Sequence, residues 1–314
     1  MTVQSDKGAL PVESLPVEHA PIPWRSYAML AVVMLFWSGN MIVGRSVRDD
    51  IPPFTLAFIR WTGAALMALP FAWRHVVADR EVLQTGWPRI LLLGLTGVAA
   101  FNALVYSGLH YTTATNALLL QAAIPAIVLM CNGLFFRMAP PVAQVVGVVL
   151  STIGVLYILL RGAPLAIFDI GFNRGDMLVL CGVFCWSIYT SLLRIRPDCH
   201  PLTFLILTFA IAIVVMAPLA ATEAAQIAKM TVSWKVVGAC AYVALLPSLV
   251  AYLMYNAAVR DIGAGRAGQT ISLMPLFGSL LAVALLGEVL HGYHIAGMLL
   301  ILGGIVVAAL AGRR

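Results

Sequence analysis

The segment LFWSGN at residues 35–40 returns in related form as VFCWSIY at residues 183–189, which places the Trp-Ser pairs at Trp37 and Trp186 149 positions apart. Each segment lies inside an apolar stretch of about 20 residues, the length that crosses the hydrocarbon core of a bilayer. Outward from this pair, further identities recur at offsets of 148 to 150: Pro53 with Pro201, Thr55 with Thr203, Leu104 with Leu253, Tyr106 with Tyr255, Pro125 with Pro275, Gly147 with Gly297, Leu150 with Leu300, and Gly154 with Gly304. The chain is therefore an internal duplication.

The composition indicates a membrane protein. Apolar residues make up 61% of the chain and charged residues only 10%, too few to solvate the surface of a soluble domain of this size. Ten apolar stretches of membrane-spanning length occur, at residues 27–47, 53–73, 88–109, 112–136, 140–160, 174–195, 200–221, 233–258, 264–287 and 291–311. We predict an all-α integral membrane protein with ten transmembrane helices.

The duplication divides these helices into two sets of five. We expect a disordered cytoplasmic tail at residues 1–26, a first repeat at 27–161 and a second repeat at 174–311. Because five is odd, the second repeat enters the bilayer from the opposite side to the first. Inverted repeats are the architecture of secondary transporters, in which one half rocks against the other around a site near the midplane.

The basic residues predict the orientation. With the N-terminus in the cytoplasm, 12 Lys and Arg residues fall on the inside and 6 on the outside, which favours both termini inside. We expect a multi-pass protein of the cytoplasmic (inner) membrane of a bacterium, acting as a monomer within the lipid bilayer. The net charge of +6 follows from this topology, and the basic clusters interleaved with aromatic residues that nucleic-acid binding requires are absent from the sequence.

Several motifs carry a family resemblance. They are the Trp-Ser segment, the run from Pro53 to Trp61, the triplet Leu286-Gly287-Glu288 ending thirteen residues after Pro275, and the pair Gly297 and Gly304. With these motifs residues 27–311 resemble the paired EamA-type repeats of the drug/metabolite transporter superfamily. Within it the chain is most similar to the ten-helix amino-acid exporters of the YddG type. One departure is that Met138 stands where the first repeat would carry the counterpart of Glu288, so a role that needs both carboxylates is not expected.

Polar side chains inside the spans indicate where a solute could bind, since burying them is costly unless they have partners or line a wet cavity. Trp37 and Asn40 share one face of the first span, and Trp186 and Tyr189 repeat that pattern in the sixth. Pseudo-symmetry would set these faces opposite each other across a central cavity. The candidate substrate-binding residues are Trp37, Asn40, Asn102, Tyr106, Gln121, Trp186, Tyr189, Ser248, Tyr252, Gln269 and Ser272. The alternative is that the amides bond neighbouring helices and the rings fill volume.

Arg60 is a charged residue inside a span, about 10 Å from the outer end of the second helix at 1.5 Å per residue. It could snorkel to the outer surface, bond carbonyl groups at a helix end, or attract a substrate.

Four further residues have expected roles in movement and coupling. Pro125 and Pro275 lie within the fourth and ninth spans, where each removes a backbone hydrogen bond and favours a kink. We interpret them as hinges, or else as static bends. Glu288 and His110 lie near helix ends and are the candidates for proton coupling, although we expect transport to run chiefly down the gradient of the solute. The sequence indicates no metal site, no cofactor and no disulfide.

Three classes of function fit such a chain. The leading hypothesis is a secondary transporter that exports amino acids, neutral or aromatic, or similar small metabolites by alternating access. Within the transporter class two alternatives remain. Proton-coupled drug efflux would require a carboxylate in the middle of a span, and sugar-phosphate exchange would require paired basic residues in the cavity. A membrane-embedded enzyme would require a catalytic cluster, and a non-transporting receptor or assembly protein would not need polar interior faces. We therefore expect no enzyme activity.

Overall fold

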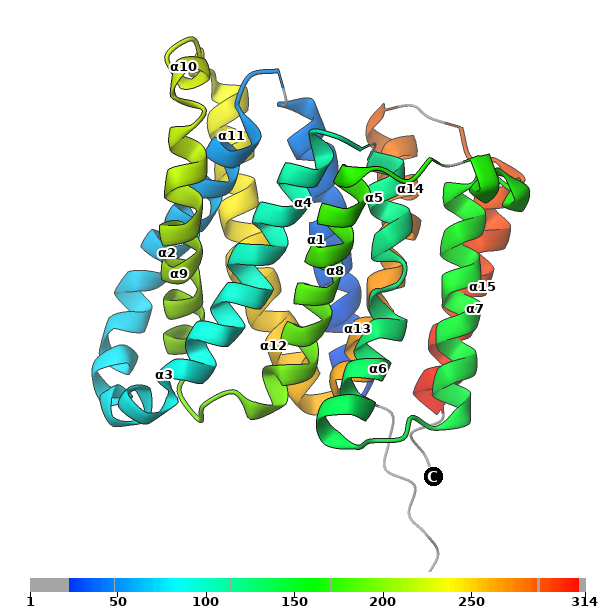
Figure 1. Ribbon diagram of the computed structural model, residues 1–314, viewed down its shortest axis with the longest axis horizontal. Coiled ribbons are helices and arrows are strands. Elements are labelled where there is room, and N and C mark those ends of the chain that lie inside the picture. Colours follow the sequence, from blue (N-terminus) through cyan, green and yellow to red (C-terminus); the bar gives the residue numbers. More distant parts are fainter. Residues whose placement is uncertain (1–22, 48, 113, 170, 287–288, 311–314) are drawn as a thin grey trace, which may run out of the picture.

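The computed structural model describes residues 23–47, 49–112, 114–169, 171–286 and 289–310. Within those ranges the chain forms helices and no strand, and ten helical segments are long and apolar enough to cross a membrane. They stand side by side as a bundle with connections at its two ends (Figure 1). We call the end at which α1 begins and α15 ends the lower end, as it lies in Figure 1, and the opposite end the upper end. The predicted all-α, ten-span fold is confirmed.

Each repeat supplies five spans. Those of the first are α1 (Trp24–Ser46), α2 (Pro53–Ala78), α3 and α4 (Arg80–Gly94 and Phe101–Leu109) joined by the π-helical turn η1 (Leu95–Ala100), α5 and α6 (Ala114–Gln121 and Ile124–Phe136), and α7 (Val142–Leu159). Those of the second are α8 (Arg174–Leu192) with η3 (Leu193–Ile195), α9 (Pro201–Ala221), α11 and α12 (Trp234–Ala244 and Ala251–Ile262) joined by the π-helical turn η4 (Leu245–Val250), α13 and α14 (Ala264–Gln269 and Leu273–Leu286) joined by η5 (Thr270–Ser272), and α15 (Gly292–Leu310). The short segments η2 (Pro164–Asp169) and α10 (Ala224–Ile227) lie at the upper end. The span α1 starts at the lower end and α8 at the upper end, so the second repeat is inverted.

Two helices begin earlier than the sequence predicted. The span α1 starts at Trp24, within the expected tail, because Ser26 is anchored by a hydrogen bond from its hydroxyl to the carboxylate of Asp261 (3.1 Å). The third span starts at Arg80 and not at residue 88, since Pro88 is accommodated inside the helix. Most of the predicted tail, residues 1–22, lies outside the described residues.

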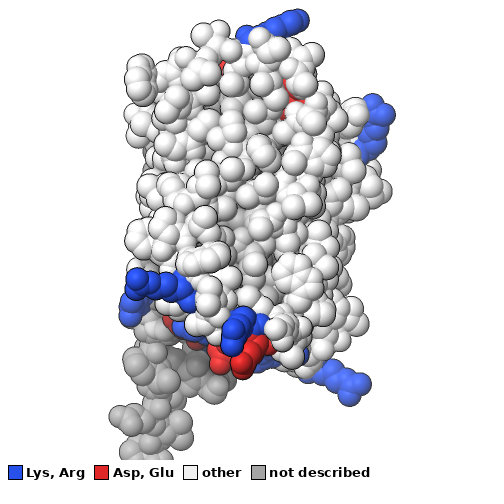
Figure 2. All heavy atoms as spheres, turned by 90° about the vertical axis from the view of Figure 1, so that its left-hand side faces the viewer, with Lys and Arg blue, Asp and Glu red and all other residues white. Residues whose placement is uncertain are grey.

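Charged side chains gather near the two ends of the bundle and leave a broad uncharged band between them on the face seen in Figure 2. Large apolar side chains are exposed within the spans, among them Leu66 in α2 and Val214 in α9, which are 62% and 73% exposed. An outward-facing apolar belt of this kind is stable only against lipid. The arrangement therefore fits a bundle that spans a bilayer.

The helices α7 and α15 form the closest contact between the repeats. A Cβ atom added to Gly147 would lie 2.4 Å from the carbonyl oxygen of Gly304, and one added to Gly154 would lie 2.6 Å from that of Gly297. Because Gly147 corresponds to Gly297 and Gly154 to Gly304, the two contacts are related by the pseudo-two-fold axis of the duplication. Small residues let helix backbones approach in this way inside membranes.

The π-helical turns η1 and η4 were not predicted from the sequence. They begin at Leu95 and Leu245, which is again an offset of 150 residues. Widened turns of this type are rare and often lie at functional sites, because they free backbone carbonyl groups from the helix ladder. In η4 the residue Pro247, which has no N–H group, contributes to the disruption of the ladder.

Candidate functional site

A cavity of about 90 Å³ lies between the two repeats, in the upper half of the bundle. Its lining runs from Trp186 and Tyr252 in the interior to Leu109, the last residue of α4 at the upper end. We call it the central cavity. Seven of the residues proposed from the sequence line it: Trp37, Asn40, Asn102, Tyr106, Gln121, Trp186 and Tyr252.

The other four proposed residues do not line this cavity. Ser248 accepts a hydrogen bond from the Nε atom of Arg60 at 2.5 Å. Gln269 donates to a hydroxyl of α7 and a carbonyl of α15 at 3.2 and 3.0 Å, so it joins helices, as the alternative interpretation held. Ser272 lines a separate void of about 20 Å³ beside Gln121. Tyr189 is fully buried beneath the cavity.

Aromatic rings form one wall of the central cavity. The rings of Trp37 and Trp186 meet edge to face, with centroids 5.2 Å apart. Trp37 also lies 5.3 Å from Tyr255 and 6.0 Å from Tyr252, and Trp186 lies 5.2 Å from Phe101. The two symmetry-related tryptophans therefore contact each other directly, instead of facing each other across an open space as expected. Ring pairs at these separations stabilise the wall in addition to the stabilisation that comes from burying their apolar area.

The two π-helical turns each offer a carbonyl group to the opposite repeat. Trp37 donates its indole N–H to the carbonyl oxygen of Pro247 in η4 at 2.9 Å, and Arg60 donates to the same oxygen at 3.3 Å. In the reciprocal contact, Tyr252 donates its hydroxyl to the carbonyl oxygen of Gly97 in η1 at 3.1 Å. Gly97 and Pro247 are 150 residues apart, so the bonds cross the repeat interface in pseudo-symmetric fashion beside the cavity.

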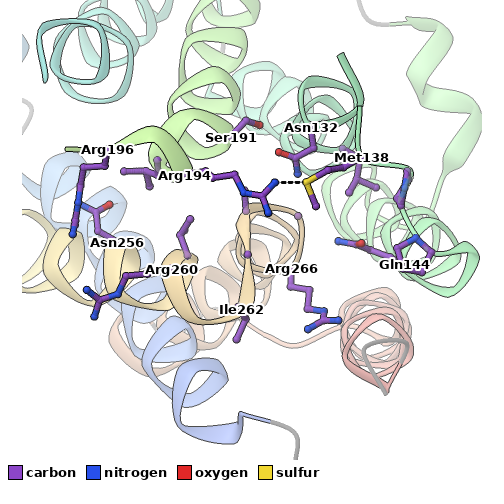
Figure 3. A pocket seen from close by; sticks show the side chains of 18 of the residues that line it. Asn132, Met138, Gln144, Ser191, Arg194, Arg196, Asn256, Arg260, Ile262 and Arg266 are labelled. Atoms are coloured by element: carbon purple, nitrogen blue, oxygen red, sulfur yellow. Dashed lines mark hydrogen bonds between the residues drawn. The ribbon is translucent and has the colours of Figure 1, made fainter. Parts of the chain in front are cut away.

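A larger cavity of about 610 Å³ opens at the lower end, and we call it the lower vestibule (Figure 3). Four arginines line it: Arg194, Arg196, Arg260 and Arg266. Asp198 is the one acidic residue among the described side chains of its wall. Arg194 reaches across the vestibule toward the sulfur atom of Met138 in the first repeat (Figure 3). A concave surface lined mainly by one sign of charge raises the local concentration of solutes of the opposite sign.

A thin layer of protein separates the two cavities. Along α8, Trp186 lines the central cavity and Ser191 lines the lower vestibule. Along α12, Tyr252 lines the central cavity and Asn256 lines the lower vestibule. Separations of five and four residues at 1.5 Å per residue make this layer about 6–8 Å thick.

Hydrogen bonds between α8 and α12 close the layer. Tyr189 donates its hydroxyl to the amide oxygen of Asn256 at 2.8 Å, and the hydroxyls of Thr190 and Tyr255 lie 3.1 Å apart. Tyr189, Thr190 and Tyr255 are completely buried. The structure therefore has a polar vestibule at one end, an aromatic cavity toward the other, and a sealed layer between them.

The expected hinge residues lie just after breaks in their spans. Pro125 is the second residue of α6, which follows the interruption after Gln121, and Pro275 is the third residue of α14, which follows η5. His110 caps the end of α4 at the upper surface, where its ring lies 5.7 Å from that of Phe54, and it does not line the central cavity. Glu288 lies outside the described residues.

The two most buried carboxylates of the described residues cap helices. Glu223 accepts hydrogen bonds from the backbone N–H groups of Phe54 and Thr55 at 3.1 and 2.7 Å, at the start of α2. Asp176 forms a capping box with Asn173 at the start of α8. Both lie at the upper end, away from the cavity wall. No group of three or more His, Cys, Asp or Glu side chains that could hold a metal ion occurs in the described part of the chain.

Two inverted repeats of five membrane-spanning helices, with cavities on either side of a sealed layer, are the architecture of a membrane transporter. The comparison with protein families agrees with this class. A model described as the EamA-like transporter family matches residues 24–160 and again residues 173–310, and the chain belongs to that family. The resemblance seen in the sequence is confirmed.

Individual relatives extend over nearly the whole chain. The "Uncharacterized transporter YyaM" of Bacillus subtilis (strain 168) is 26% identical over 90% of this chain and 93% of the relative. The "Probable amino-acid metabolite efflux pump" of Salmonella typhimurium is 25% identical over 89% of this chain and 92% of the relative. A crystal structure with 18% identity superposes with a TM-score of 0.74, covering 93% of this chain and 98% of that one, and supports the fold.

Proposed function

We propose that this protein exports amino acids or similarly sized metabolites across the cytoplasmic membrane by alternating access. The observation that carries the proposal is the aromatic central cavity at the repeat interface, separated from the lower vestibule by one closed layer. Its wall combines indole and phenol rings with uncharged amides, a set suited to a small solute that has an apolar side chain. The efflux activity named for the Salmonella typhimurium relative supports the same class of solute.

In this mechanism the lower vestibule faces the cytoplasm. Contacts between the repeats at this layer, such as the hydrogen bond from the Ser191 hydroxyl to the Val128 carbonyl oxygen at 3.3 Å, break when the repeats rock, and the central cavity then opens toward the vestibule. Bonds that cross between the repeats, such as that from Tyr252 to Gly97, are the contacts that such rocking changes. The breaks before Pro125 and Pro275 supply symmetry-related positions at which α6 and α14 could bend.

The orientation is tested by cysteine accessibility in a variant whose five native cysteines are replaced. Gln84→Cys at the lower end and Gln226→Cys at the upper end form a matched pair, because both positions are exposed. A membrane-impermeant maleimide applied to intact cells should label residue 226 and spare residue 84. The reverse result would place the lower vestibule outside the cell.

Transport is tested in proteoliposomes with a panel of labelled amino acids. We expect uptake of bulky apolar amino acids, and we expect Trp37→Ala and Trp186→Ala to reduce it at least tenfold. Trp73→Ala is the matched control, because this tryptophan is 62% exposed on the outside of the bundle. If both cavity variants transport at the rate of the control, the rings are packing elements and the central cavity is not the path.

A second candidate is the transport of phosphorylated sugars, which the four arginines of the lower vestibule favour. Phosphate groups are bound by clusters of arginine. The same proteoliposomes test this candidate with a labelled hexose phosphate. Saturable uptake of the phosphate ester, with none of any amino acid, would replace the first candidate by the second.

A further inference from the structure

Arg60 is a buried cation in the wall of the central cavity. Its side chain is 6% exposed, and it is the one charged residue among the described residues that line this cavity. It does not snorkel to the upper surface, which was one of the alternatives left open by the sequence. We propose that Arg60 binds the carboxylate of the transported solute, so that a free carboxylate is the group the transporter requires. This inference rests on the proposed function and names the solute class.

The hydrogen bonds of Arg60 leave its charge without an acidic partner. A guanidinium carries five N–H donors. In the structure the Nε atom of Arg60 donates to the Ser248 hydroxyl at 2.5 Å, and its Nη2 atom donates to the Pro247 carbonyl oxygen at 3.3 Å. Its Cζ atom lies 4.5 Å from the centre of the Trp61 ring. None of these partners is an anion, and no described carboxylate pairs with Arg60.

A buried charge without a counter-ion is costly in a membrane interior, so its place in the cavity wall needs a compensating group. The partners above hold the guanidinium in one orientation, on the side of Ser248 and Pro247. Its remaining donors are available to the cavity that it lines. An incoming anion would supply the missing partner.

A carboxylate fits this site better than a phosphate does. The planar fork of a guanidinium matches the two oxygens of a carboxylate in a bidentate pair. A phosphate monoester brings up to two negative charges, and the described lining of the cavity offers a single cation. The rest of the wall is aromatic or amide, which suits a carboxylate attached to an apolar group.

The amides of the cavity have free acceptors for the rest of an amino acid. Asn102 donates its amide N–H to the Val98 carbonyl oxygen at 2.7 Å, and Gln121 donates to the Ala117 carbonyl oxygen at 3.4 Å. Both bonds use the nitrogen atom, so the amide oxygens remain acceptors for an ammonium group. A zwitterion could therefore bind with its carboxylate on Arg60 and its ammonium group near these oxygens.

The experiment compares phenylalanine with phenylalaninamide, which keeps the ring and the amino group but has no carboxylate. In proteoliposomes of the full chain we expect phenylalanine to inhibit uptake of labelled phenylalanine at least tenfold more strongly than the amide does. This arm needs no mutation, so it decides the question even if Arg60 variants fail to fold. Equal inhibition by the two compounds would overturn the proposal.

A second arm uses Arg60→Gln and Arg60→Lys. We expect Arg60→Gln to raise the KM for phenylalanine at least tenfold and to abolish its preference over the amide, with Arg60→Lys intermediate because it keeps the charge without the fork. The control is Arg174→Gln, since Arg174 stacks on Tyr111 at 3.8 Å at the upper end and lines neither cavity. A folded Arg60→Gln variant that keeps the preference for phenylalanine would refute the role of Arg60.

The outcomes for the two proposals are distinguishable. Uptake of amines or uncharged solutes in preference to carboxylates would leave the transport function standing and remove the role of Arg60. The absence of uptake of every solute in the panel by the parental protein would overturn both.

Discussion

The cross-repeat bond from Tyr252 to Gly97 should help to set the balance between conformations of the transporter. In Tyr252→Phe only one hydroxyl is lost, while the ring and its contacts with Trp37 and Trp61 remain. A hydrogen bond of this kind contributes about 1 kcal/mol. If the bond is absent in the opposite conformation, its loss changes the ratio of the two conformations about fivefold, because every 1.4 kcal/mol is a factor of ten.

The assay is the labelling rate of Thr190→Cys, a position that is completely buried in the layer between the cavities. A cysteine there reacts only when the layer opens, so its rate follows the open population. We expect labelling to be about five times faster in Tyr252→Phe than in the parental background. Tyr111→Phe at the upper surface is the control. Equal rates in all three backgrounds would refute the reasoning, because the bond would then be present in both conformations or contribute nothing.

Two further predictions concern the packing of the repeats and a histidine pair at the lower end. Gly304→Ala should cost about 1–3 kcal/mol of stability, because its Cβ would lie 2.4 Å from a backbone oxygen of α7, whereas Gly303→Ala, with open space around it, should be neutral or stabilising in thermal unfolding. His200 stacks on His75 with ring centroids 3.5 Å apart. Burial, which is the larger cause, and the neighbouring His75 both lower the pKa of His200 below its ordinary value, while Asp79 acts to raise it. The unfolded chain therefore binds the proton more readily, so stability should fall as pH falls through about 6.5, and an NMR titration should show a higher pKa for His200 in His75→Leu.

The fold could be predicted from the sequence because its determinants are local and repeated. Segment length and hydropathy identify helices that cross a bilayer, and the recurrence of residues such as Trp37 and Gly147 at one offset identifies the duplication. The beginnings of helices were less accurate. Whether α1 begins at Trp24 depends on a contact with Asp261, which lies more than 200 residues away in the sequence.

The site could be predicted only in part. The face of α1 that carries Trp37 and Asn40 does line the central cavity, because helical periodicity determines which residues share a face. Periodicity does not determine how two faces meet, so the direct contact between Trp37 and Trp186 was missed. The cavity-lining residues Phe101 and Met274 also escaped notice, since apolar residues in an apolar span carry no distinguishing signal.

Arginines and π-helical turns show a different limit of sequence reasoning. The sequence predicted an excess of basic residues on one side of the membrane. That four of them converge on one cavity depends on the packing of η3, α12 and α13, which the sequence does not give. The turns η1 and η4 arise from hydrogen-bond geometry within spans that the sequence predicted as uninterrupted helices. Pro247 offered a hint in η4, and the matching turn at Leu95–Ala100 contains no proline at all.

The last prediction concerns energy coupling. Coupling to protons requires a group that alternates between protonated and free forms within reach of the solute. The described lining of the central cavity contains no Asp, Glu or His. Glu223 serves as a cap for α2, and His110 lies at the upper surface.

A transporter with this lining should move its solute down the gradient of that solute, by facilitated diffusion or by exchange. We expect an imposed pH difference alone to produce no uphill accumulation of phenylalanine in proteoliposomes, while preloaded unlabelled phenylalanine accelerates entry of the labelled compound. The proton ionophore that collapses the pH difference serves as the control and should leave exchange unchanged. Accumulation that requires the pH difference, and that disappears in Glu288→Gln, would instead identify Glu288 as the coupling residue. Proton coupling would then depend on a carboxylate that is not part of the described lining of the central cavity.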